Sequence, residues 1–245
     1  TGDNFGRGGA IGTSKFVIGA TGDDDNGSNS GSAYIYDLDG TNEVKITASD
    51  GAANDYFGYN IGIGGTIIVV GAPFKNSYTG AAYIFDLSGN QLGILTGSDS
   101  AASDRYGFSV GVGTDKIVIG AYDHHTDGNA DQGQAYIYDH KGANEVKITG
   151  SDSVANDQFG YAVGIGATVI VVSANEAHIN GVDGVGKAYI FDLSGTQLGI
   201  ITASDGALQD RFGSDIGVGT SKIVIGASYD NTGGGFWDEG SAYIY

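Results

Sequence analysis

The chain has 245 residues, of which 29 are acidic and 11 are basic, so its net charge at pH 7 is −18. Such a surface repels nucleic-acid phosphates and anionic membranes, so we expect no nucleic acid as a partner. The chain has no Cys, which excludes a disulfide framework and thiol catalysis. No apolar run approaches the roughly 18 residues of a membrane-spanning helix, so we expect no membrane insertion.

A motif of Asp, one variable residue, an aromatic residue and Gly occurs five times. Its copies are DNFG, DYFG, DRYG, DQFG and DRFG, which begin at Asp3, Asp55, Asp104, Asp157 and Asp210 and are 52, 49, 53 and 53 residues apart. A period of about 50 residues is typical of a four-stranded propeller blade. We therefore predict an all-β fold, a single β-propeller domain over residues 1–245. Its five blades are expected at about 3–54, 55–103, 104–156, 157–209 and 210–245.

The first two segments of each unit, in chain order, are a Gly-rich stretch and an apolar strand. The Gly-rich stretch, such as FGYNIGIG at 57–64, has room for a close approach, so we expect it to lie against neighbouring blades. The apolar strand, such as KIVIGA at 116–121, ends in a small pair of residues that is Gly-Ala in four of the units. Its β-branched side chains favour a buried strand.

The third and fourth segments complete the blade. The third is AYIYD or AYIFD, and it begins at Ala33, Ala82, Ala135, Ala188 and Ala242. In the fourth, Val44 and Ile46 alternate with polar residues, which is typical of an outer strand with one wet face. The fifth unit reaches Tyr245 before a fourth strand, so we predict that the last blade lacks its outer strand. The chain holds no Met, so Thr1 is expected to begin a processed or excised segment.

The recurring Phe-Gly and Gly-Ala elements, once Gly-Ala-Pro at 71–73, resemble the FG-GAP repeat family over essentially the whole chain. That family includes the propeller heads of integrin α subunits and several lectin-like proteins. The resemblance implies a propeller with an extracellular role in binding or adhesion. In integrin heads a calcium loop joins the two elements, but here the joints are hairpins such as IGTSK and IGGT, which are too tight to surround a cation. The family's metal sites are therefore not carried over.

The loops that follow Gly-Ala differ between units, whereas the strands barely change. Binding residues tend to lie on variable loops held by a rigid frame, so we expect binding on this face. The five loops occupy residues 21–32, 73–81, 122–134, 175–187 and 228–241.

Two of these loops carry candidate metal ligands. Asp123, His125, Asp127 and Asp131 have the spacing of a calcium loop with His in one carboxylate position, and this His would favour a transition metal. The second candidate is Asp23 with Asp25, where adjacent carboxylates repel one another unless a cation lies between them. Ca²⁺ is the only cofactor that we predict. The alternative for both loops is a solvated polar turn.

Aromatic residues in the same loops are candidates for a ligand contact. Trp237 and Phe236 could stack on a sugar ring while Asp238 accepts hydrogen bonds from hydroxyl groups; the alternative is an aromatic plug over the propeller rim. Other aromatic candidates are Phe74, Tyr78, Tyr122 and Tyr229.

The paired Asp residues of the crossovers are interpreted as structural, because they recur in equivalent places. We expect side-chain oxygens that accept backbone N–H bonds ahead of the inner strand. The pairs are Asp50 with Asp55, Asp99 with Asp104, and Asp152 with Asp157. The alternative is a ring of cation sites.

Taken together, the residues favour a non-catalytic recognition or adhesion module, extracellular or on a cell or particle surface. Its partner would be a glycan or a surface protein, bound through loops on one face with or without Ca²⁺. The alternative is a structural subunit of an extracellular or viral assembly, which self-associates through the incomplete blade. We predict no enzyme, since no catalytic motif stands out. A glycosidase carboxylate pair is left open by residue type alone.

Overall fold

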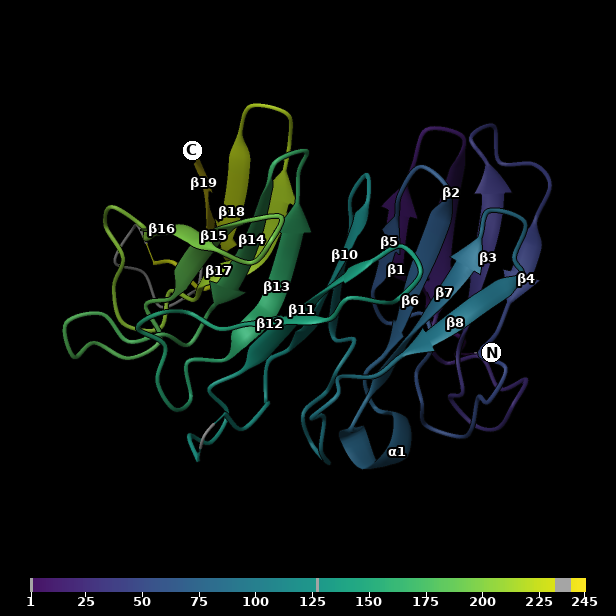
Figure 1. Ribbon diagram of the computed structural model, residues 1–245, viewed down its shortest axis with the longest axis horizontal. Helices are drawn as coiled ribbons and strands as arrows, with labels where there is room; N and C mark the ends of the chain where they lie inside the picture. The colour runs from purple at the N-terminus through teal and green to yellow at the C-terminus, as the bar shows by residue number, and fades with distance from the viewer. Residues whose placement is uncertain (1, 127, 232–238) are drawn as a thin grey trace. The chain divides into compact units, whose positions relative to one another are not determined.

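Five antiparallel sheets make up the computed structural model of the chain, which describes residues 2–126, 128–231 and 239–245 (Figure 1). The first sheet contains β1 (Phe5–Ile11), β2 (Lys15–Ala20), β3 (Ser32–Asp37) and β4 (Val44–Ile46). The second contains β5 (Ile61–Ile63), β6 (Ile67–Ala72), β7 (Ala81–Asp86) and β8 (Gln91–Leu95). The third contains β9 (Ser109–Val112), β10 (Lys116–Ala121), β11 (Gln134–Asp139) and β12 (Val146–Ile148).

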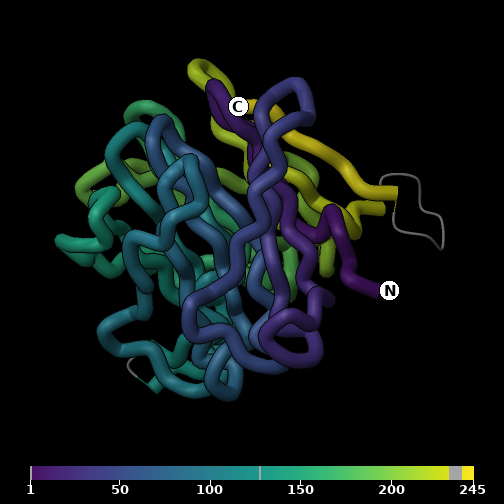
Figure 2. The backbone as a smooth tube through the Cα atoms, turned by 90° about the vertical axis from the view of Figure 1, so that its right-hand side faces the viewer, coloured from purple at the N-terminus to yellow at the C-terminus, as the bar shows by residue number. Residues whose placement is uncertain are grey.

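The last two sheets follow the same plan. The fourth contains β13 (Phe159–Ile165), β14 (Val169–Ala174), β15 (Lys187–Asp192) and β16 (Gln197–Ile201). The fifth contains β17 (Phe212–Val218), β18 (Ile223–Ala227) and β19 (Ser241–Ile244), and no fourth strand. In every sheet the strands pair in chain order, as the β1–β4 meander in Figure 2 shows. The predicted fold, an all-β propeller whose fifth blade is one strand short, is confirmed.

The chain separates into two compact units, Thr1–Ile119 with Tyr138–Glu145, and Gly120–Ile137 with Val146–Tyr245. Within the first unit, the second strand of one blade packs closely against the Gly-rich segment of the next blade. A Cβ atom added to Gly19 would lie 2.0 Å from the carbonyl oxygen of Gly58, and one added to Gly71 would lie 2.0 Å from that of Gly107. The close approach predicted for the Gly-rich segments is therefore confirmed. Whether the chain is one domain stays a prediction.

Each blade encloses its own aromatic core. In the second blade Phe57 lies edge-on to Tyr83 and Phe85, with ring centroids 5.4 and 5.8 Å apart, and all three are buried. The fourth blade repeats this trio as Phe159, Tyr189 and Phe191. The aromatic residue of the repeated motif is therefore a core residue in the last four copies, whereas Phe5 of the first copy is 58% exposed.

The predicted role of the second crossover Asp is also confirmed. In four crossovers its carboxylate accepts a hydrogen bond from the backbone N–H three residues earlier, at 2.6 to 3.0 Å. The donors and acceptors are Ala52 to Asp55, Ala101 to Asp104, Val154 to Asp157, and Ala207 to Asp210. These bonds close the turn that leads into each inner strand.

The joints between the first and second strands are as tight as predicted, because Gly12 N–H bonds back to the Lys15 carbonyl at 2.8 Å. The five joints occupy residues 12–14, 64–66, 113–115, 166–168 and 219–222. Among the described residues, no helix is both long enough and apolar enough to cross a membrane.

Candidate ligand-binding cleft

The loop after β6 has a backbone unlike that of its counterparts. It contains the single helical turn α1 (Lys75–Tyr78), but Asn76, Ser77 and Tyr78 have φ angles of 50, 59 and 66°. These values belong to the left-handed region, which costs roughly 1 to 2 kcal/mol for each residue other than Gly. Such a conformation persists only where the surroundings impose it, and it is found preferentially at functional sites.

Lys75 fixes this strained turn to the preceding crossover. Its side chain is buried, and its ammonium donates to the Asp55 carboxylate at 3.0 Å and to the Asp50 carbonyl at 2.8 Å. The Asp50 carboxylate also receives the Tyr83 hydroxyl at 2.8 Å. Burial and these carboxylates raise the pKa of Tyr83, so its hydroxyl keeps its proton and remains a donor.

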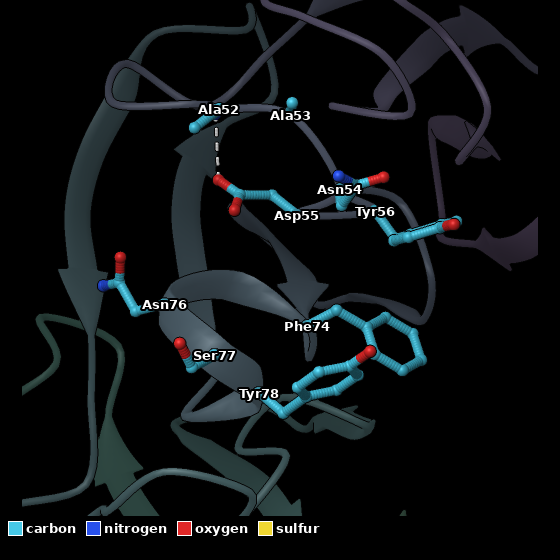
Figure 3. Close-up of a pocket in the computed structure, with 9 residues that line it drawn as sticks. All are labelled: Ala52, Ala53, Asn54, Asp55, Tyr56, Phe74, Asn76, Ser77 and Tyr78. Atoms are coloured by element: carbon cyan, nitrogen blue, oxygen red, sulfur yellow. Dashed lines mark hydrogen bonds between the residues drawn. The ribbon is translucent and has the colours of Figure 1, made fainter.

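Two adjoining hollows open between the crossover and the turn; together we call them the blade-two cleft. The first, of about 480 Å³, lies between residues 52–56 and 74–78 (Figure 3). The second, of about 340 Å³, shares Tyr56, Phe74 and Tyr78 with the first. It is completed by Asn4, Arg7, Thr21 and Tyr59. Both volumes are in the range of small-ligand sites.

Phe74 is the centre of an aromatic cluster in the cleft. Its ring centroid lies 5.1 Å from Tyr56, 5.4 Å from Tyr59 and 5.5 Å from Tyr78, and each pair meets edge to face. Tyr78 is 49% exposed, and Figure 3 shows its ring beside that of Phe74. The cluster thus offers apolar ring surface and phenolic hydroxyls at one place, next to the amide of Asn54.

The cleft is positively charged, whereas the chain as a whole is strongly negative. The Arg7 guanidinium lies over the Tyr59 ring, 4.0 Å from its centroid, and that of Arg105 lies 5.9 Å from Phe74 and 5.8 Å from Tyr78. The one carboxylate among the residues that line the two hollows belongs to Asp55, which is paired with Lys75. The cleft is therefore locally cationic on a chain of net charge −18.

The predicted Asp23 and Asp25 pair already has a protein cation. The Lys45 ammonium lies 2.8 Å from the Asp23 carboxylate and also contacts that of Asp25. Burial raises the pKa of Asp23, but its bonds with Lys45, the Asp25 N–H and Ser32 outweigh burial and leave the pKa below its usual value. A metal ion here would have to displace the Lys45 ammonium, and the metal itself stays a prediction.

The predicted loop of Asp123 is only partly drawn together. The His125 ring lies 3.5 Å from the Asp131 carboxylate, and its Nδ1 is 3.0 Å from the Asp123 carbonyl oxygen. Asp127 is outside the described residues. No cluster of three or more metal-ligating side chains occurs among the residues that are described. This metal site also stays a prediction.

The aromatic candidates are placed very differently from one another. Phe236, Trp237 and Asp238 lie outside the described residues. Tyr122 is 6% exposed and packs its ring against Tyr161, so little of its surface is left for a ligand. Tyr229 is 42% exposed, beneath the guanidinium of Arg211. Only Phe74 and Tyr78 are brought together in a cleft.

Sequence reasoning missed Arg7, Tyr56 and Tyr59, which lie outside the variable loops. Each occupies a variable position of an otherwise constant motif. The residue after the motif Asp is Asn4, Tyr56, Arg105, Gln158 or Arg211, and the residue two places after the aromatic position is Arg7, Tyr59, Phe108, Tyr161 or Ser214. Variation beside constant residues was the signal that could have identified them.

Comparison with protein families finds the FG-GAP repeat in five consecutive segments, residues 1–36, 41–85, 90–138, 143–191 and 196–245. Comparison with curated proteins finds no match.

Proposed function

The chain belongs to the FG-GAP repeat family, and from that premise we propose that it is a non-catalytic extracellular recognition module that binds a glycan in the blade-two cleft. The aromatic cluster around Phe74 is the observation that carries this proposal. The C–H faces of a sugar ring are apolar and pack on aromatic rings, while its hydroxyl groups need the polar groups that Tyr56, Tyr59 and Asn54 supply.

The strain of the turn supports the same conclusion. Three left-handed residues follow one another, and Ser77 and Tyr78 adopt this region against their own preference, so the turn presents the Tyr78 ring in a fixed place. A ring fixed in this way loses little conformational freedom when a ligand binds. The buried Lys75 anchor therefore acts as a positioning residue for the cleft.

The chemistry of the cleft favours binding over hydrolysis. Glycosidic bonds are usually cleaved by two facing carboxyl groups. Among the residues that line the cleft, Asp55 alone has a carboxylate, and Lys75 and the Ala52 N–H already occupy it. The proposal therefore assigns this cleft to recognition.

A glycan array with neutral and acidic oligosaccharides tests the proposal, followed by calorimetry on the best binder. Tyr78→Ala and Phe74→Ala should each weaken binding by about tenfold or more, as loss of a central aromatic contact does. Leu92→Ala is the matched control, because Leu92 is 59% exposed on β8 of the same blade, outside the cleft lining. Tyr229→Ala tests the other exposed aromatic candidate. Glycan binding that none of the cleft variants weakens would refute this site.

A second candidate function, a structural subunit, is favoured by the fifth sheet. Its strand β19 pairs with β18 alone in the described chain, and a hollow of about 370 Å³ beside it is lined by Ile190, Ile201 and Tyr245. In earlier blades a hairpin Gly packs against the matching side chains of the preceding blade; examples are Gly89 on Val44 and Ile46, and Gly195 on Val146 and Ile148. A strand donated by a neighbouring molecule would fill the same place.

Sedimentation over a range of concentrations tests this second function. A defined oligomer that a peptide of sequence SGTQLGIITASD dissociates would support strand donation. A chain that stays monomeric at all concentrations and does not bind the peptide would rule it out.

A further inference from the structure

We propose that the glycan recognised by the blade-two cleft is acidic, and that Arg7 binds a carboxylate of a uronic acid residue in it. This inference rests on the proposed glycan-binding function and specifies its ligand class. It is carried by the position of Arg7, by the absence of an acidic partner for it among the described residues, and by the comparison with Arg211, which has a similar aromatic contact but is paired with a carboxylate.

Arg7 is exposed and lines the smaller hollow, next to Asn4, Tyr56 and Tyr59. Its guanidinium lies over the Tyr59 ring at 4.0 Å, and this contact fixes one face of the group while its N–H edge is left for a ligand. A planar fork of donors matches the two oxygens of a carboxylate, which it can bind through parallel hydrogen bonds.

Among the residues that the structure describes, no carboxylate lies within ion-pair distance of Arg7. The chain has 29 acidic residues and only three arginines, so an arginine without an acidic neighbour is unexpected. The pairing of Asp55 with Lys75 also removes the acidic lining residue as a source of repulsion for an anionic ligand. Arg105, 5.8 Å from the Tyr78 ring, adds a second positive charge to the cleft.

Arg211 provides the internal comparison. It lies over the Tyr229 ring at 4.6 Å, but its Nε is 2.8 Å from the Glu176 carboxylate. The same stacked arrangement is thus neutralised by the protein in one place and left for a ligand in the other. The difference points to Arg7 as an anion-binding group rather than a general packing device.

A uronic acid carries the two kinds of group that the lining of the smaller hollow would recognise. A uronic acid has an apolar ring face and a carboxylate at its edge, and the smaller hollow offers Phe74 and Tyr78 together with Arg7. A neutral sugar would leave the guanidinium without a partner. A carboxylate that is not attached to a sugar ring would leave the aromatic cluster without a packing partner.

Calorimetry with oligogalacturonate and with its methyl ester tests the inference, because esterification removes the negative charge of each carboxyl group and adds only a methyl group. We expect the acidic form to bind and its affinity to fall as salt is added, since salt screens an exposed ion pair. Arg7→Gln should weaken that binding by about tenfold to a hundredfold. Arg7→Lys should also weaken it, since an ammonium lacks the planar fork. Arg211→Gln should leave it unchanged.

The outcomes separate this inference from the function on which it rests. If the ester binds as tightly as the acid and Arg7→Gln changes nothing, the acidic ligand is wrong while glycan binding stands. A ligand that is sulfated but has no carboxylate would overturn the uronic acid assignment. If no glycan binds at all, the proposed function fails as well. The melting temperatures of the Arg7 variants should be unchanged, which would show that any loss of binding does not come from a loss of folding.

Discussion

Replacement of Asp55 by Asn should destabilise the protein and loosen the cleft together. The substitution keeps the size of the side chain and an oxygen for the Ala52 N–H, but it removes the charge that faces Lys75. Both partners are nearly inaccessible, with 5% of the Asp55 side chain and 8% of the Lys75 side chain exposed. The variant therefore leaves an ammonium buried beside a neutral amide.

The contacts that Lys75 keeps in the variant indicate how much free energy of unfolding is lost. Removing one partner of a buried ion pair typically costs about 3 to 5 kcal/mol. Lys75 keeps its bond to the Asp50 carbonyl, and the half-exposed Asp50 carboxylate is 3.4 Å away. The loss should thus fall at the lower end, about 3 kcal/mol, which for a chain of this size corresponds to a melting temperature about 6 to 12 °C lower.

Two further variants make the reasoning refutable in denaturant-unfolding experiments. Lys75→Met combined with Asp55→Asn removes the whole pair, so the double variant should recover much of the loss seen in the single variant. Asp210→Asn is the matched control, because Asp210 accepts the same backbone bond from Ala207 but has no basic partner among the described residues. It should cost little or nothing. A double variant as unstable as the sum of its singles, or an Asp210→Asn variant as unstable as Asp55→Asn, would refute the assigned role of the ion pair.

Two further predictions concern packing and pH. Gly71→Ala should lower stability by about 1 to 3 kcal/mol or more in chemical unfolding, because its Cβ would lie 2.0 Å from the Gly107 carbonyl oxygen, whereas Gly65→Ala, with nothing within 4 Å, should not. Because the pKa of Asp23 is lowered on folding, the stability contributed by its carboxylate is present above the unfolded pKa and is lost as pH falls through the folded one. The stability difference between the native chain and Lys45→Met, followed by unfolding from about pH 6 to about pH 2, should therefore shrink toward acid pH; a constant difference would contradict it.

The fold was predictable because several independent patterns agree. The period of the Asp-x-aromatic-Gly motif sets the blade, and the tight joints and Gly-rich segments set its inner edge. The structural role of the crossover Asp followed from recurrence alone, and the bond from Ala52 to Asp55 shows it. Each of these features recurs at equivalent positions of several units, so it can be recognised in the sequence by its recurrence.

The cleft was much harder to predict because it occurs once. The contact between Arg7 and Tyr59 joins equivalent positions of two blades, and no pattern within one unit reveals it. The left-handed turn has no Gly or Pro at 76–78 to announce it. The contact of Lys45 with Asp23 joins β4 to the loop after β2, and residue spacing does not specify it.

The source of positive charge differs between the blades. In the first, second and fourth blades, described residues place a lysine beside the carboxylate that the third-strand tyrosine contacts. In the first blade it is Lys45, on β4; in the fourth it is Lys187, at the start of β15 and 2.8 Å from Asp152. In the second blade it is Lys75, which lies inside the variable loop, in α1, and is 3.4 Å from the Asp50 carboxylate.

This difference ties the loop conformation to the charge balance of the crossover. Lys45 and Lys187 reach their carboxylates from strands, whereas Lys75 reaches Asp55 from inside the loop, so the turn after it is held in place. The fifth blade shows the opposite case: Tyr243 donates to both Asp205 and Asp230, and burial together with these charges raises the pKa of Asp210. The buried ion pair of Lys75 thus couples the crossover to the loop that carries Phe74 and Tyr78, the two aromatic residues of the proposed binding surface.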